Sequence, residues 1–362
     1  MKNLFKHIVF GAFIALAFSN AIVAVDVARY ELADRGSGQP TSQTDSAKPA
    51  PAPQRWRGLI GEYGPDKGIL YILEKDQSLC TLFKGANIEC LKEVSRNVFK
   101  FLSRSGPHAA QTIVFSRDAQ GRATLARIER EEYPRRQIEP EGGGPQLHVE
   151  PLRPVRELLK EALAAQPPKE SGEFRPPDLV ELKKVIPTIK LDIRYATTNN
   201  LFGTIFYSEA RAFMQRPAAE ALDRVNRKLR GLGYGLLVHD AYRPWYVTKV
   251  FWDATPDDKK IFVADPSKGS RHNRGAAVDL TLYDLKTGKP VEMVSTYDET
   301  TDRAYPNYPG GTSLQRWYRQ LLRDAMEAEG FTVYEAEWWH FDYKDWQKYA
   351  IGNVPFNQIG NK

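Results

Sequence analysis

The sequence predicts an α+β catalytic domain with a largely antiparallel sheet flanked by helices, preceded by a small all-β domain. Two features of the chain support this prediction. Between Trp56 and Tyr133, short runs of β-branched and aromatic residues alternate with turn residues, a pattern typical of strands joined by tight turns. After Asp178, strand-like runs come in pairs between amphipathic helical stretches, which favours an α+β domain over a parallel sheet.

The order of these segments divides the 362 residues into five regions. We expect a signal peptide at 1–24, a Pro- and Ser-rich linker at 25–54, the all-β domain at 55–133, a linker with a short helix at 134–177, and the catalytic domain at 178–362. A chain of this length accommodates two domains. Its 42% apolar and 27% charged residues are typical of a globular protein.

The N-terminus has the composition of an export signal. Lys2 and Lys6 precede an apolar run over residues 8–18, and the small residues Ser19 and Ala21 follow it. The run is shorter than the roughly 20 residues that a membrane-spanning helix needs, which favours a cleaved signal over an uncleaved anchor. We therefore expect an exported protein, periplasmic or secreted, without a transmembrane segment after cleavage.

The charge pattern excludes one class of partner. The formal net charge is +6, and basic residues alternate with acidic ones along the chain. This pattern indicates a solvated surface of mixed charge, so no nucleic-acid partner is expected.

The all-β region offers few candidate catalytic side chains, and we interpret it as an accessory domain. Its cysteines, Cys80 and Cys90, flank the turn residues 85–87, so a hairpin could place them opposite each other. A disulfide and a pair of buried thiols both fit this spacing. The expected strands cover residues 68–74, 79–83, 97–102, 112–115 and 123–128.

The rest of the chain shows both helical and strand periodicity. Helices are expected at 153–165, with Pro154 at the first position, at 217–230 and at 313–329. The expected strands are 189–195, 234–238, 276–283 and a final aromatic strand at 331–343.

A candidate metal site begins with His272 and Asp279. The histidine lies in a loop-like stretch and the aspartate in the following strand, so the two side chains can meet at one ion. An imidazole and a carboxylate are ordinary ligands of zinc.

The Glu337-Trp-Trp-His340 motif offers a third ligand and a base. On a continuous strand, residues three apart point to opposite faces. We therefore expect an irregularity near Trp338 and Trp339 that turns both side chains to the same site. His340 would then be the third ligand of one Zn²⁺ per chain. Glu337 would act as the general base.

Arg243 is the third candidate element. It follows a predicted strand and precedes Pro244, which holds it rigidly. Its guanidinium could stabilise the oxyanion of a tetrahedral intermediate, although an arginine at such a place is also a common partner in surface ion pairs. The sequence contains no Gly-x-Ser-x-Gly and no Ser-x-x-Lys motif, which argues against a serine nucleophile.

Taken in order, these motifs resemble the D-alanyl-D-alanine dipeptidase family, the VanX-like zinc D,D-dipeptidases of peptidase family M15. The resemblance covers about 182–349 and includes the stretch 191–197. It is carried by the run 240–244, by Ser270-x-His-x-x-Gly-x-Ala-x-Asp279, and by 337–340. It says nothing about residues 25–175.

The resemblance implies zinc on His272, Asp279 and His340, with Glu337 as the base and Arg243 on the scissile carbonyl oxygen. It also implies a small substrate pocket, in which Asp298 would face the free ammonium of a dipeptide. The residues matching that pocket are Tyr195, Tyr207, Ser270 and Asp298. Arg271 and Asn273, on either side of His272, are positions at which specificity is expected to differ.

The expected function is zinc-dependent hydrolysis of D-alanyl-D-alanine, or of a similar small D,D-dipeptide, in cell-wall peptide turnover. The expected partners are that dipeptide and peptidoglycan, the latter through the β domain. Two alternatives remain. One is a D,D- or L,D-carboxypeptidase acting on longer stem peptides, which would not need Asp298. The other is a non-catalytic wall-binding protein, which would have no use for Glu337.

Overall fold

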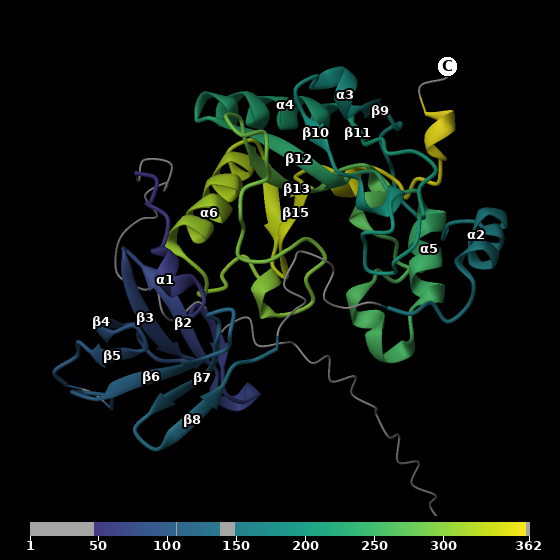
Figure 1. Cartoon of the computed structure of the whole chain (residues 1–362). Coiled ribbons are helices and arrows are strands. Elements are labelled where there is room, and N and C mark those ends of the chain that lie inside the picture. The colour runs from purple at the N-terminus through teal and green to yellow at the C-terminus, as the bar shows by residue number, and fades with distance from the viewer. Residues whose placement is uncertain (1–46, 106, 138–148, 360–362) are drawn as a thin grey trace, which may run out of the picture. The chain divides into compact units, whose positions relative to one another are not determined.

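A five-stranded mixed sheet forms the centre of the C-terminal half (Figure 1). The structure is a computed structural model and describes residues 47–105, 107–137 and 149–359. β10 pairs with β12 in parallel, and the other three pairings are antiparallel. This arrangement confirms the largely antiparallel α+β sheet. In spatial order the strands are β10 (Lys190–Leu191), β12 (Tyr234–Asp240), β13 (Ala277–Asp284), β15 (Glu337–Tyr343) and β14 (Phe331–Tyr334).

Two long helices pack together against this sheet, and both were predicted (Figure 1). α4 (Arg216–Gly231) has Pro217 in its first turn, where a missing N–H is tolerated. α6 (Ser313–Glu327) begins at a capping box in which Thr312 and Gln315 satisfy each other's backbone N–H groups. Each helix buries an apolar stripe, so their burial against the sheet follows from the helical period.

Of the four remaining α-helices that the structure describes, one was predicted and three were not. α2 (Val155–Ala164) is the helix expected at 153–165, and Pro154 precedes its first residue. It packs against α5 (Trp245–Ala254), which was not predicted because seven of its ten residues are apolar, so its polar and apolar faces differ little in the sequence. The short helices are α1 (Gln54–Arg57) and α3 (Leu182–Val185). Among the residues that the structure describes, no helix has the length and apolar character needed to cross a bilayer.

Two predicted strands are wrong in extent. The strand expected at 189–195 is reduced to β10, and Arg194–Ala196 form a 3-10 turn. The strand expected at 331–343 is a hairpin, because β14 ends at Tyr334 and β15 starts at Glu337. Both halves are rich in aromatic residues, so hydrophobic pattern alone did not reveal the turn between them. A further small sheet pairs β9 (Leu179–Glu181) with β11 (Phe213–Gln215).

The N-terminal strands form an eight-stranded antiparallel sheet in chain order. A bridge between Tyr63 and Arg135 closes it, with a backbone hydrogen bond of 2.8 Å from Gly64 N to Pro134 O. Its interior is filled by aromatic and aliphatic side chains, as expected for a barrel of eight strands. The strands are β1 (Gly61–Tyr63), β2 (Leu70–Lys75), β3 (Ser78–Phe83), β4 (Glu89–Ser95), β5 (Val98–Phe101), β6 (Thr112–Arg117), β7 (Ala123–Ile128) and β8 (Glu131–Pro134).

Five of these eight strands were predicted, and the hairpin predicted around residues 85–87 is present. Cys80 on β3 lies directly opposite Cys90 on β4, and the two form a disulfide. Of the two alternatives that the spacing left open, the structure has the disulfide.

Buried polar contacts join this sheet to the start of α6. Glu74 of β2 accepts a 2.8 Å hydrogen bond from the backbone N–H of Ser313, at the positive end of the α6 dipole. Arg316 donates to the Glu74 carbonyl oxygen at 2.7 Å. The structure describes residues 47–54 of the predicted linker, of which Gln54 begins α1, and Lys48 Nζ lies 5.4 Å from the centre of the Tyr234 ring. The predicted signal peptide lies outside the described residues.

Candidate metal and catalytic site

Three buried side chains from three segments meet on one face of the central sheet. His272 lies in the 3-10 turn Arg271–Arg274, Asp279 on β13 and His340 on β15. Asp279 and His340 are direct cross-strand partners, so both side chains point to the same face. The turn that carries His272 ends at Gly275, whose φ of 68° is the left-handed conformation that glycine adopts without strain.

The spacing of these three residues suits a tetrahedral metal. His340 Nδ1 lies 2.9 Å from Asp279 Oδ1 and 3.1 Å from His272 Nε2, and His272 Nε2 lies 3.4 Å from Asp279 Oδ1. Ligands about 2.0 Å from a tetrahedral ion lie about 3.3 Å from one another. The three candidate ligand atoms therefore surround a point at which such an ion fits.

Each candidate ligand makes a hydrogen bond to a neighbouring group through one of its polar atoms. In each case the other polar atom, which faces the metal position, remains available to bind. His272 Nδ1 donates to the Ala241 carbonyl oxygen at 2.7 Å, which leaves Nε2 as the ligand atom. His340 Nε2 lies 3.0 Å from Asp342 Oδ1, which leaves Nδ1. Tyr297 donates its hydroxyl to Asp279 Oδ2 at 3.0 Å, which leaves Oδ1. Such outer-shell partners fix the orientation of metal ligands.

Electrostatics also favour a cation at this point. Burial opposes ionisation of Asp279, but the charges and hydrogen bonds of His272 and His340 hold its pKa well below the usual range. Burial lowers the pKa of His340, yet its hydrogen bonds to Asp279 and Asp342 raise the pKa overall, to about 10. Asp279 and Asp342 thus stabilise the protonated, positively charged form of His340. A bound divalent cation would replace the additional proton and supply the positive charge instead.

Glu337 stands beside this cluster at the start of β15, with Oε2 3.9 Å from His340 Nδ1. The pairing of β14 with β15 jumps from Val333 opposite Phe341 to Tyr334 opposite Glu337, so the intervening residues are out of register. This is the irregularity predicted near Trp338 and Trp339, and it brings Glu337 to the same side as His340. Burial raises the pKa of Glu337 above its usual range, although 37% of its side chain stays exposed.

Arg243 is buried, which excludes the alternative of a surface ion pair. Its Nε and Nη2 donate to Asp240 Oδ2 at 2.9 and 2.7 Å, a forked ion pair within a single turn. Tyr207 donates its hydroxyl to the other oxygen of Asp240 at 2.8 Å. The guanidinium carbon lies 5.2 Å from the centre of the Tyr195 ring and 4.9 Å from that of Phe251. Arg243 is therefore fixed in orientation before any ligand arrives.

Asp298 is a partly buried residue in a left-handed backbone conformation, with φ of 61°. The Tyr195 hydroxyl lies 3.3 Å from Oδ2 and 3.4 Å from Oδ1. Asp298 forms no ion pair with any residue that the structure describes. Burial and the nearby carboxylates of Asp279 and Glu337 raise the pKa of Asp298 to about 8. Strained backbone of this kind is often found at functional sites.

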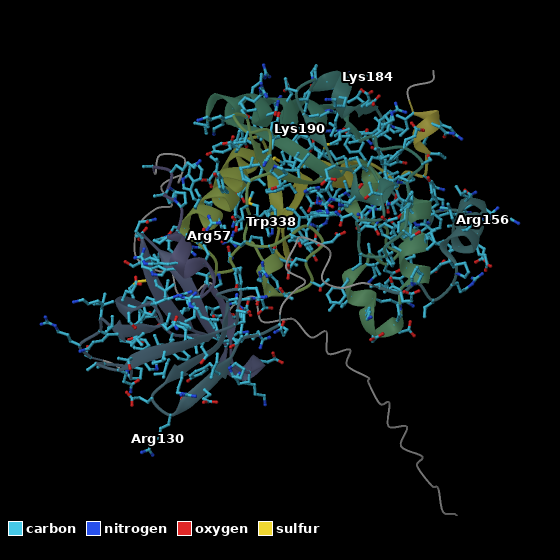
Figure 2. The ribbon with its side chains drawn as sticks, viewed as in Figure 1. Arg57, Arg130, Arg156, Lys184, Lys190 and Trp338 are labelled. Atoms are coloured by element: carbon cyan, nitrogen blue, oxygen red, sulfur yellow. A yellow bond between two sulfur atoms is a disulfide. The ribbon has the colours of Figure 1, made fainter. Side chains whose placement is uncertain are left out.

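The other residues of the predicted site serve as supports in this structure. Ser270 Oγ accepts a hydrogen bond from the His272 backbone at 3.2 Å and so caps the ligand turn. Asn273 is fully buried and donates to the Arg243 carbonyl oxygen at 2.8 Å, so it connects the turn that carries His272 to the segment that carries Arg243. Trp338 donates to Ser295 at 2.8 Å and packs inside the fold, as expected for a structural residue (Figure 2).

Sequence reasoning assigned no role to several supporting residues: Asp240, Tyr297 and Asp342. A signal for Asp342 was present, since it is two residues after His340 and must lie on the same face of a strand. Asp240 lies three residues before its partner Arg243, so a sequence signal was present there as well, whereas the partner of Tyr297 is Asp279, 18 residues earlier, and only the folded structure reveals that contact.

The family model for D-ala-D-ala dipeptidase, Peptidase_M15, matches residues 175–357. This chain belongs to the M15 peptidase family. A D-alanyl-D-alanine dipeptidase of Escherichia coli strain K12 is 32% identical over 174 residues, which cover 48% of this chain and 89% of that protein. One from Enterococcus faecium is 34% identical over 182 residues, covering 45% of this chain and 90% of that protein.

This M15 peptidase has its candidate metal cluster, Glu337 and Arg243 inside the matched region. The strands β1–β8 lie outside that region. A solved LdcB LD-carboxypeptidase is similar over 53% of this chain at 19% identity, with a TM-score of 0.28, which is too low to support an argument about fold or substrate.

Proposed function

We propose that this peptidase hydrolyses D-alanyl-D-alanine, or a closely similar small D,D-dipeptide, with one zinc ion held by His272, Asp279 and His340. The donor set, its spacing and its tautomers support the choice of zinc over magnesium or calcium, since hard cations prefer an all-oxygen shell. When bound, zinc would polarise the peptide carbonyl and acidify a coordinated water.

The proposed chemistry of the protein groups follows from their positions. Glu337 would accept a proton from the attacking water and return it to the leaving amine, because its raised pKa suits both steps. Arg243, held by Asp240, would stabilise the negative charge that develops on the carbonyl oxygen. A preorganised guanidinium stabilises that charge without needing to reorient.

The observation that carries the choice of a dipeptide is Asp298. The charged form of this partly buried carboxyl group is unfavourable, as its raised pKa indicates, and it has no ion-pair partner among the described residues; a substrate ammonium would supply that partner. Tyr195, which touches Asp298, would limit the room around the substrate amino group. A carboxypeptidase acting on longer stems would have an amide in place of the ammonium and would gain nothing from this residue.

We also propose that the peptidase is exported and acts in cell-wall peptide turnover. The basic and apolar N-terminal sequence supports export, and so does the Cys80–Cys90 disulfide, because such bonds persist in oxidising compartments. Binding of peptidoglycan by the β1–β8 sheet remains part of this proposal. Testing it requires a pull-down of peptidoglycan by the full chain and by a variant that lacks residues 55–135.

The decisive experiment measures zinc content together with hydrolysis of D-Ala-D-Ala and of its N-acetylated form. We expect about one zinc per chain and rapid hydrolysis of the free dipeptide only. Equal rates on both compounds would favour the carboxypeptidase alternative. Absence of hydrolysis by the zinc-loaded protein would contradict the proposed function and favour a wall-binding protein.

A further inference from the structure

An ion pair links the two segments that carry the histidines of the candidate metal site. Arg271 immediately precedes His272 in its turn, and Asp342 lies two residues after His340 on β15. Arg271 Nη1 donates a hydrogen bond to Asp342 Oδ2. The pair therefore connects the ligand turn to the ligand strand at a point next to both ligands.

The second oxygen of Asp342 is used by His340. Asp342 Oδ1 lies 3.0 Å from His340 Nε2, and 7% and 9% of these two side chains are exposed. This hydrogen bond requires the proton to be on Nε2, so it leaves Nδ1 directed at Asp279, 2.9 Å away. If the imidazole lost this contact, it could rotate or change tautomer, and a donor N–H would then face the metal position.

The guanidinium of Arg271 is itself held in place. It lies over the rings of Tyr334 at 5.3 Å and Trp346 at 5.2 Å, and the Tyr334 ring also contacts the His340 ring, with centres 5.6 Å apart. A planar cation between two aromatic rings loses little freedom on binding a carboxylate. Arg271 thus turns toward Asp342, a contact that the sequence did not suggest.

We infer that Arg271 and Asp342 are positioning residues for the metal centre. Asp342 sets the tautomer and ring orientation of His340, and Arg271 holds Asp342 in place and fixes the spacing between His272 and His340. This inference rests on the metal site of the proposed function but not on its substrate. Outer-shell partners of metal-bound histidines typically contribute about 10- to 100-fold in metal affinity or activity.

The test is zinc affinity of the full chain, measured by competition with a chromogenic chelator. Arg271→Met and Asp342→Asn keep the side-chain volume and remove the ion pair. We expect each to weaken zinc binding by about 10- to 100-fold. Because Arg271 acts through Asp342, the double variant should bind zinc no more weakly than Asp342→Asn alone. Arg274→Met is the matched control, since Arg274 lies in the same turn and over the same Trp346 ring but pairs with Glu170.

A second readout reports the imidazole directly. In ¹⁵N spectra of the zinc-loaded protein, the Nε2 proton of His340 should exchange slowly with water and should exchange faster in both single variants. Thermal unfolding of each metal-free variant separates local effects from loss of the fold. The inference is overturned if Arg271→Met binds zinc like the Arg274→Met control, or if the losses of the two single variants add in the double variant. Neither readout uses a substrate, so failure of the dipeptidase proposal would be seen separately.

Discussion

Replacement of Asp298 by asparagine tests the choice of substrate most directly. Asparagine has nearly the same shape and also tolerates the left-handed conformation at this position, where φ is 61°. The variant therefore changes the charge at one end of the proposed pocket and little else. The reaction of Glu337 and Arg243 should proceed as before once a substrate is bound.

The expected magnitude follows from the surroundings of the carboxyl group, which is partly buried and would be covered further by a bound dipeptide. Two unit charges about 4 Å apart interact by about 4 kcal/mol at an effective dielectric constant near 20. Removing one partner of a buried charge pair typically costs 2–5 kcal/mol, which corresponds to roughly 30-fold to several thousandfold in a rate or binding constant. We expect Asp298→Asn to lower kcat/KM for free D-Ala-D-Ala by an amount in this range.

The assay compares free D-Ala-D-Ala with N-acetyl-D-Ala-D-Ala on both proteins. The blocked dipeptide has no ammonium, so Asp298→Asn should leave its slow hydrolysis nearly unchanged. The ratio of kcat/KM for the free dipeptide to kcat/KM for the blocked one should therefore fall toward one. An equal loss of kcat/KM on both compounds, or an unchanged preference, would refute the role of Asp298 as an ammonium anchor.

The same variant has a consequence for stability that is independent of substrate. Burial raises the pKa of Asp298 to about 8 in the folded, metal-free protein, far above its value in an unfolded chain. Between about pH 4 and pH 8 the carboxyl group of Asp298 is protonated in the folded state and ionised in the unfolded state. The free energy of unfolding therefore falls as the pH rises through this range. Asp298→Asn should therefore gain stability relative to the wild type as the pH rises from 5 to 8, as measured by urea unfolding of the metal-free proteins.

Further predictions concern the base, the guanidinium, the metal and the disulfide. Glu337→Ala should retain zinc and lose about 10²- to 10⁴-fold in kcat, and retained turnover would contradict its role as the base. Arg243→Lys keeps a cation beside Asp240 but loses the planar guanidinium with its two N–H contacts. We expect kcat to fall by about 10²-fold, while the midpoint of urea unfolding changes little. Because the pKa of His340 is about 10 in the metal-free protein, zinc must displace its proton, and zinc affinity measured by chelator competition should rise about tenfold per pH unit between pH 6 and 8. Cys80→Ser combined with Cys90→Ser should lower the stability of the β1–β8 sheet by roughly 2–3 kcal/mol in denaturant unfolding, with kcat on D-Ala-D-Ala unchanged.

Local patterns were enough to predict much of the fold. The helices α4 and α6 and the strands β12 and β13 were predicted because each is long enough to show a clear period. The turn between β14 and β15 was missed because aromatic residues continue across it on both sides. Helix α5 was missed because its polar side is narrow: only Lys249 and Asp253 are charged, and seven of its ten residues are apolar.

The sequence by itself determined which residues are candidates to bind a metal and which is the candidate base: His272, Asp279, His340 and Glu337 are recognisable from residue type and spacing. It also required an irregularity around Trp338, since a regular strand would separate Glu337 from His340.

Only the tertiary structure decided how these groups are held. Most of the partners that orient them come from other segments of the chain: Tyr297 contacts Asp279, the Ala241 carbonyl oxygen contacts His272, and Arg271 contacts Asp342, which itself lies beside His340 on the same strand. A hydrogen bond depends on distance and direction in space, which spacing along the chain does not specify when the partners lie on different segments. For the same reason, only the folded structure reveals that Asp298 has no ion-pair partner among the described residues.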